Sequence, residues 1–143
     1  MSDEIKRRFE SVGLAVIGTF SGTGPTVTEA FHRVVNVEAQ PVETIPGDTP
    51  DLAVRVNEAW TRHARETGVL NEDDSFLAAG SLEHGWFHVR LTRATNLYSL
   101  QDLEGDLLFV ARDLSGQQVC AVSREGAEYW ILEEEFHSGD TAS

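Results

Sequence analysis

The sequence has little cysteine, little proline and no long hydrophobic run. Cys120 is the one cysteine among 143 residues, so no disulfide can form within the chain, and we expect a reducing compartment. The longest nearly apolar run, residues 12–20, is far shorter than the about 20 residues that a membrane-spanning helix needs. The first eight residues lack the apolar core of a signal peptide. The sequence therefore predicts a cytoplasmic protein without membrane contact.

Basic residues are also scarce. The chain has 11 Lys and Arg against 24 Asp and Glu, which gives a formal net charge of −13. Residues 72–143 carry most of this excess, with 14 acids and 4 bases, whereas residues 1–71 have 10 acids and 7 bases. Such a charge repels a phosphate backbone and attracts a basic surface. We therefore expect no direct nucleic-acid binding and, unless the acidity only keeps the protein soluble, a basic protein partner.

The chain does contain enough apolar material for one folded domain. Hydrophobic residues make up 41% and charged residues 24%, which are typical proportions for a globular protein. A length of 143 residues fits one domain. We expect a single domain over residues 1–137 and a frayed tail over residues 138–143.

Three segments have the apolar periodicity of amphipathic helices. They are residues 3–12, 26–36 and 50–67. The third is the clearest, and we expect Thr49 to cap it and Gly68 to end it. In the second, Thr26 and Glu29 have the spacing of a capping box. Its β-branched residues nevertheless leave an extended conformation over residues 26–45 open.

After Trp86 the apolar period changes from that of a helix to that of a strand. Expected strands are residues 14–20, 86–93, 107–112, 117–123 and 128–136. Short turns join the last three, so residues 107–136 are predicted to form an antiparallel meander. Residues 37–45 contain Pro41, which restricts them to a sheet edge. The sequence thus predicts an α+β protein in two layers, with helices packed on a mostly antiparallel sheet that ends in a C-terminal β-meander.

No spacing of residues marks a catalytic or metal site. The Gly-rich segment 18–24 could hold an anion, but it lacks the lysine of a phosphate-binding loop, and a tight turn explains it equally well. His84 and His88 would lie about 13 Å apart in a strand, too far to share a zinc ion. Cys120 is interpreted as a buried small hydrophobe and His63 as a core histidine. We assign no catalytic residue, cofactor or metal.

The acidic second half supplies the candidate partner-binding residues. They are Asp102, Glu104, Asp106, Trp130, Glu133, Glu134 and Glu135. The turns and strand ends of a meander collect at two rims of the sheet, so we expect these charges to cluster. An exposed aromatic residue among carboxylates is suited to act as a binding hot spot.

Part of the chain resembles a known family. The segment Phe76-Leu77-Ala78-Ala79-Gly80, the strands after Trp86, and the segment 108–116 followed by two more strands are similar to the SUKH superfamily of bacterial immunity proteins. The resemblance covers roughly half the chain. It implies an α+β domain in which a helix ends near a glycine turn before a meander, and it implies toxin neutralisation by tight protein binding. It assigns no residues.

Together these observations predict a non-enzymatic acidic protein-binding module, an inhibitor or immunity-type protein that engages a basic protein partner. The alternative is a small-molecule-binding protein or small enzyme with a pocket between helices and sheet, which would require polar residues that converge in an apolar cavity.

Overall fold

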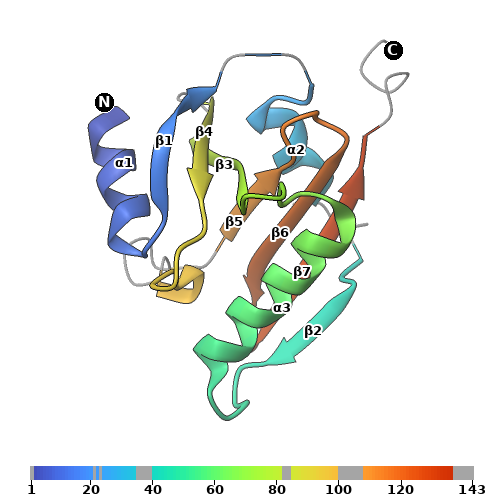
Figure 1. Cartoon of the computed structure of the whole chain (residues 1–143). Helices are drawn as coiled ribbons and strands as arrows, with labels where there is room; N and C mark the ends of the chain where they lie inside the picture. The colour runs from blue at the N-terminus through green and yellow to red at the C-terminus, as the bar shows by residue number, and fades with distance from the viewer. Residues whose placement is uncertain are drawn as a thin grey trace.

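The computed structural model describes residues 2–20, 22, 24–34, 40–81, 85–99 and 108–136. In chain order the elements are α1 (Ser2–Ser11), β1 (Ala15–Phe20), α2 (Val27–Val34), β2 (Glu43–Pro46), α3 (Leu52–Thr67), β3 (Ser75–Ser81), β4 (Gly85–Arg90), the short 3-10 helix η1 (Leu97–Ser99), β5 (Leu108–Arg112), β6 (Gln118–Glu125) and β7 (Glu128–Glu135). The strands form one seven-stranded sheet in the order β1-β4-β3-β5-β6-β7-β2 (Figure 1). Every described pairing is antiparallel, so the predicted α+β class is confirmed.

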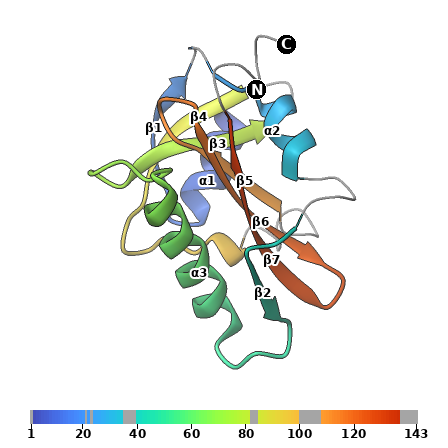
Figure 2. The same ribbon diagram turned by 90° about the vertical axis from the view of Figure 1, so that its right-hand side faces the viewer.

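Helices cover both faces of the sheet. On one face, α1 and α3 bury Phe9 and Trp60 against strand residues such as Cys120. On the other face, α2 buries Ala30 against residues such as Leu132. Figure 2 shows α3 and α2 on opposite sides of the sheet. The expected two layers are therefore three, because the central strands are apolar on both faces and need a cover on each.

The predicted C-terminal meander is confirmed. Strands β5, β6 and β7 pair in sequence order, and the β6–β7 register runs from Gln118 opposite Glu135 to Glu125 opposite Glu128. Sequence analysis missed β3, which lies between β4 and β5 in the sheet. Residues 76–78 of β3 are all fully buried, so they lack the alternation that marks a strand. This segment is a strand, whereas the resemblance implied the end of a helix there.

Two helix ends agree with the sequence and one does not. The capping box of α2 is present, since the Thr26 amide donates to Glu29 Oε1 at 2.9 Å and the Glu29 amide donates to Thr26 Oγ1 at 3.1 Å. Gly68 ends α3 in a left-handed conformation with φ 86°. Thr49 does not cap α3, because Asp51 occupies the N-cap position with φ 55°. The Thr49 hydroxyl donates to the Pro46 carbonyl at the end of β2 instead.

The outer strands differ from each other. Strand β2 is an edge strand, as expected next to Pro41, and it pairs with β7 from Glu43 opposite Ile131 to Pro46 opposite Glu128. Strand β1 forms the other edge and pairs with β4, with an irregularity of register at its centre. Within the described ranges, no helix is long and apolar enough to cross a membrane.

Candidate functional site

His63 lies between two carboxylates rather than in a purely apolar core. Its Nδ1 is 2.6 Å from Glu133 Oε2 on β7, and its Nε2 is 2.9 Å from Glu43 Oε1 on β2. Arg62 also donates to Glu43. We call Glu43, His63 and Glu133 the Glu–His–Glu cluster. It joins α3 to β2 and β7 at one edge of the sheet, and it supplies hydrogen-bond partners to the half-buried His63.

The Glu–His–Glu cluster links α3 to β2 and β7 and is not a metal centre. The two carboxylates contact opposite nitrogens of one imidazole, so their oxygens do not converge on a common point with it. In the described part of the chain, no group of three such side chains could hold a metal ion. Burial by itself raises the pKa of Glu43, but hydrogen bonds from His63 and Arg62 outweigh burial and hold that pKa below its usual value.

Cys120 is adjacent to this cluster, but its buried thiol is not activated as a nucleophile. It pairs across the sheet with Glu133, whose other neighbour is His63, so a thiol, a carboxylate and an imidazole come close in the fold. The Cys120 side chain is fully buried, and burial raises the pKa of its thiol far above the usual range, an effect that the charge of Glu133 increases. A thiol that stays protonated is a poor nucleophile. This arrangement therefore offers no activated cysteine.

The Gly-rich segment borders a buried cation rather than an anion site. The Pro25 carbonyl accepts from Trp86 Nε1 at 2.9 Å and from Arg112 Nη1 at 3.0 Å. Arg112 is 1% exposed, and its guanidinium lies over the rings of Phe20 and Trp86. A Cβ added at Gly24 would lie 2.9 Å from this guanidinium. The glycine therefore permits close packing onto Arg112, which explains the segment structurally.

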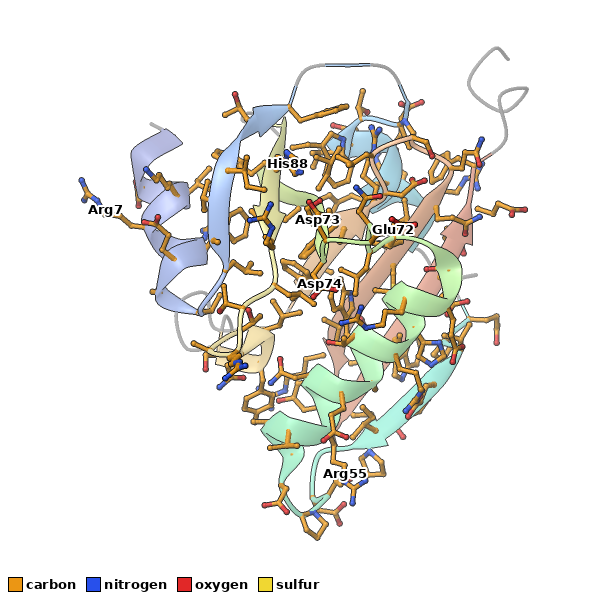
Figure 3. All side chains as sticks on the ribbon, in the orientation of Figure 1. Arg7, Arg55, Glu72, Asp73, Asp74 and His88 are labelled. Carbon is orange, nitrogen blue, oxygen red and sulfur yellow. The ribbon has the colours of Figure 1, made fainter. Side chains whose placement is uncertain are left out.

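The two histidines of the sequence pattern do not form a pair in the described structure. His88 lies in β4 (Figure 3), and its Nε2 is buried without a hydrogen-bond partner. His84 lies outside the described residues. Burial of this unpaired nitrogen costs free energy, and His88 belongs to no group of three potential metal ligands among the described side chains.

The structure divides the candidate partner-binding residues. Asp102, Glu104 and Asp106 lie outside the described residues. The three glutamates that end β7 already contact groups of the same chain. Glu133 contacts His63, Glu134 lies 3.7 Å from Arg33 Nη1, and Glu135 accepts from Gln118 Nε2 at 3.0 Å. Trp130 is on the same strand but lies nearer its other end.

A second group of carboxylates gathers at the opposite end of the meander. The β6–β7 turn lies against the turn that follows β2, because the Gly47 amide donates to the Ala127 carbonyl at 2.7 Å. These two turns carry the exposed acids that we call the acidic rim: Asp48, Asp51, Glu125 and Glu128. None of the four forms an ion pair within the described part of the chain. In Figures 1 and 2 the rim is at the lower end of the molecule.

Trp130 lies beside the acidic rim on the sheet face that α2 partly covers. It is half-buried, and its indole Nε1 donates to Glu128 Oε1 at 3.3 Å. Across the strand pair it faces Thr44 on β2. Val42, which directly precedes β2 and whose amide donates to the Ile131 carbonyl, is 48% exposed. We call Val42, Thr44 and Trp130 the Trp130 patch, and sequence analysis identified only its tryptophan.

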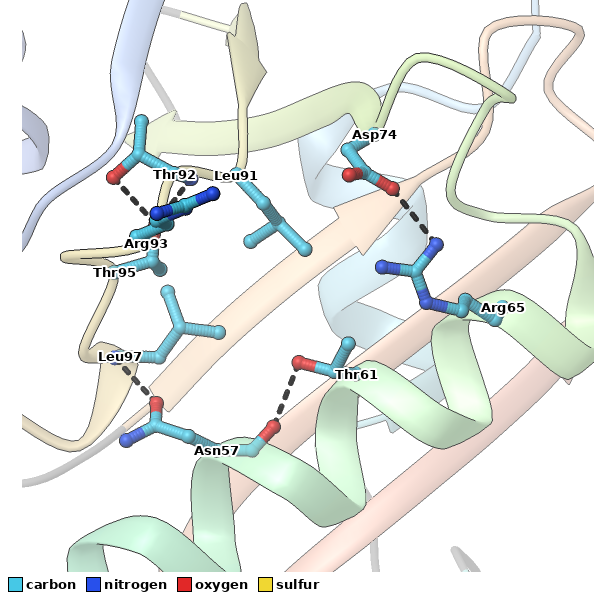
Figure 4. Close-up of a pocket in the computed structure, with 9 residues that line it drawn as sticks. All are labelled: Asn57, Thr61, Arg65, Asp74, Leu91, Thr92, Arg93, Thr95 and Leu97. Atoms are coloured by element: carbon cyan, nitrogen blue, oxygen red, sulfur yellow. Dashed lines mark hydrogen bonds and ion pairs between the residues drawn. The ribbon is translucent and has the colours of Figure 1, made fainter.

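A pocket of about 420 Å³ lies between α3 and the segment that follows β4. Its lining residues are Asn57, Thr61, Arg65, Asp74, Leu91, Thr92, Arg93, Thr95 and Leu97 (Figure 4). We call it the α3 pocket. Helix α3 supplies the first three residues, and the turn before β3 supplies Asp74. No local motif in the sequence indicated it, because its walls come from three separate segments.

Comparison with known proteins gives no relative: no family model, no curated protein and no solved structure matches this chain. The resemblance to immunity proteins therefore stays an expectation, and the functional argument depends on the geometry of the chain itself.

Proposed function

We propose that the protein is a non-enzymatic acidic binding module, of the inhibitor or immunity type, that engages a basic protein partner through the acidic rim and the Trp130 patch. One observation carries the proposal. A half-buried tryptophan, hydrogen-bonded to Glu128, lies beside exposed carboxylates that have no cationic partner among the described residues. Aromatic anchors with a charged surround are typical of binding hot spots.

The acidic rim is better suited to an external cation than the glutamates at the end of β7. Glu133 and Glu134 contact His63 and Arg33 of the same chain, so a partner would have to compete for them. At the rim, Arg124 is the one base of the β6–β7 turn, and its Nε donates to the Gly126 carbonyl. We therefore propose a binding surface at the beginning of β7, not at its end, where the sequence analysis expected it.

Charge and apolar contact have separate roles in this proposal. The field of a chain with net charge −13 accelerates the encounter with a basic protein, and salt screens that field. The Trp130 patch supplies the apolar contact that determines how long the complex lasts. Association should therefore depend on charge, and dissociation on the tryptophan.

The test begins with capture of a partner from extract of the native cell, followed by measurement of association rates at several salt concentrations. Reversing Glu125 and Glu128 to Lys should slow association about tenfold at low salt. The matched control reverses Glu4 and Glu10 on α1, which are also exposed but lie far from the rim in Figure 1. This control changes the net charge equally and should slow association much less.

Trp130→Ala should accelerate dissociation and leave the association rate nearly unchanged. If the protein is an inhibitor, the partner should also lose its own activity when the partner is saturated with this protein. A partner whose association rate ignores salt and the Glu125/Glu128 reversal would refute the proposal. A nucleic acid as the bound partner would refute it more directly.

A further inference from the structure

We propose that the α3 pocket binds a small organic acid, whose carboxylate or phosphate pairs with the Arg93 guanidinium while its apolar part lies on Leu91. This inference is independent of the acidic rim, which lies beyond the other end of α3. The expected ligand class is the organic anion, and the α3 pocket takes no part in the proposed protein binding.

The charge of the pocket opposes that of the whole chain. Its lining holds Arg65 and Arg93 against Asp74, so two positive charges and one negative give +1, in a chain with net charge −13. Arg93 is exposed and makes no ion pair within the described residues. Such a local reversal of charge favours an anion over a cation.

Each guanidinium group offers N–H groups to an acid group on its own side of the pocket. Arg65 Nη1 donates to Asp74 Oδ1 at 2.7 Å, which leaves other N–H groups of this guanidinium for a ligand. In Figure 4 the Arg65 and Arg93 guanidinium groups lie on opposite sides of Leu91. The planar fork of arginine matches the oxygens of carboxylate and phosphate.

The neutral polar groups of the pocket are occupied and shape its walls. The Thr61 hydroxyl donates to the Asn57 carbonyl at 2.8 Å, and Asn57 Oδ1 accepts from the Leu97 amide at 2.6 Å. The hydroxyls of Thr92 and Thr95 both donate to the Gly13 carbonyl. Recognition of a ligand therefore depends mainly on Arg93 and Leu91. The volume of about 420 Å³ is within the range of small-molecule sites.

Nearby acids restrict the ligand to one with a single acid group. Glu72, Asp73 and Asp74 follow one another along the turn before β3 (Figure 3). Asp73 accepts from Ser75 and lies 3.4 Å from Arg90, but Glu72 has no cation partner in the described ranges. A polyanion would meet their repulsion, whereas a monoacid can pair with Arg93 and place its apolar part on Leu91.

The experiment is a nuclear magnetic resonance titration of the full chain with two organic acids, benzoate and phenyl phosphate. Phenol serves as the neutral control and inorganic phosphate as the charged control without an apolar part. We expect saturable shifts of the Leu91 and Leu97 methyl signals with at least one organic acid, at concentrations on the order of millimolar. The tighter of the two identifies the acid group as carboxylate or phosphate. Phenol and inorganic phosphate should bind more weakly than that acid.

Arg93→Gln tests the mechanism, because it leaves the Arg65–Asp74 ion pair intact. It should weaken binding about tenfold or more. The matched control is Arg55→Gln, an exposed arginine of α3 that does not line the pocket (Figure 3), and it should leave the affinity unchanged. Equal binding of phenol, equal loss in both variants, wild-type affinity in Arg93→Gln, or no methyl shift by about 10 mM would overturn the proposal. Reversing Glu125 and Glu128 should leave anion affinity intact, which separates this test from that of the partner.

Discussion

Replacing Trp60 by alanine should remove a large part of the stability of the fold. Its side chain is fully buried, with ring centroids 5.2 Å from Phe76 and 5.4 Å from Phe109. A buried tryptophan removes about 150–250 Å² from water, worth about 4–6 kcal/mol at about 25 cal/mol per Å². Alanine retains a small part of this, so we expect Trp60→Ala to cost about 3–5 kcal/mol.

Trp60→Phe separates the two contributions of the indole. The ring packing largely remains, but the hydrogen bond from Nε1 to the Cys120 carbonyl, at 3.2 Å, is lost. We expect a cost of about 1–3 kcal/mol from this hydrogen bond and the smaller ring. Trp130→Ala is the comparison at a half-buried tryptophan, and its cost should be below that of Trp60→Ala.

The assay is urea unfolding followed by far-ultraviolet circular dichroism, because a tryptophan signal would change with the substitution itself. The midpoint should fall while the slope with denaturant stays constant, which indicates an unchanged extent of unfolding. A cost below about 1 kcal/mol for Trp60→Ala would mean that α3 does not pack on the sheet as described. The placement of the α3 pocket and of the Glu–His–Glu cluster would then be wrong as well.

Three further outcomes follow from single residues. Cys120 should react slowly with thiol reagents in the native protein and rapidly after unfolding, and rapid native labelling would contradict its burial. The folded-state pKa of Glu43 is below its ordinary value of 4.5, so its contribution to stability is complete above pH 4.5 and is lost as the pH falls through the folded-state pKa. The free energy of unfolding measured across acid pH should show this loss, and His63→Ala should make the loss smaller. Gly24→Ala should cost about 1–3 kcal/mol in calorimetry, because φ is 104° and the new Cβ meets Arg112; a wild-type unfolding temperature would contradict this.

The elements with strong local patterns were predictable from the sequence. Helix α3 has an apolar stripe that includes Val56 and Trp60, and a glycine follows it, so both its existence and its end were correct. The strands of the meander are joined by short turns, which allow only antiparallel pairing. Strand β3 was missed because Phe76, Leu77 and Ala78 are all buried, and a continuous apolar run does not distinguish a strand from a buried helix.

The polar clusters could not be predicted because their members are distant in the sequence. His63 is 20 residues from Glu43 and 70 from Glu133, so its position on an apolar stripe suggested burial but not its carboxylate neighbours. The position of Glu125 and Glu128 beside a turn was visible in the sequence. Asp48 joins them only through the pairing of β2 with β7, for which no local pattern exists.

The position of β2 in the sheet has a consequence for the order of folding. Glu125 and Glu128, three residues apart, pair across the β6–β7 turn, whereas Glu43 pairs with Ile131 at a separation of 131 − 43 = 88 residues. Closing the longer loop costs more chain entropy and is repaid only once β7 is in place. We therefore expect β2 to join the sheet after the folding transition state. Substitutions at Glu43 should then accelerate unfolding while the folding rate stays nearly constant.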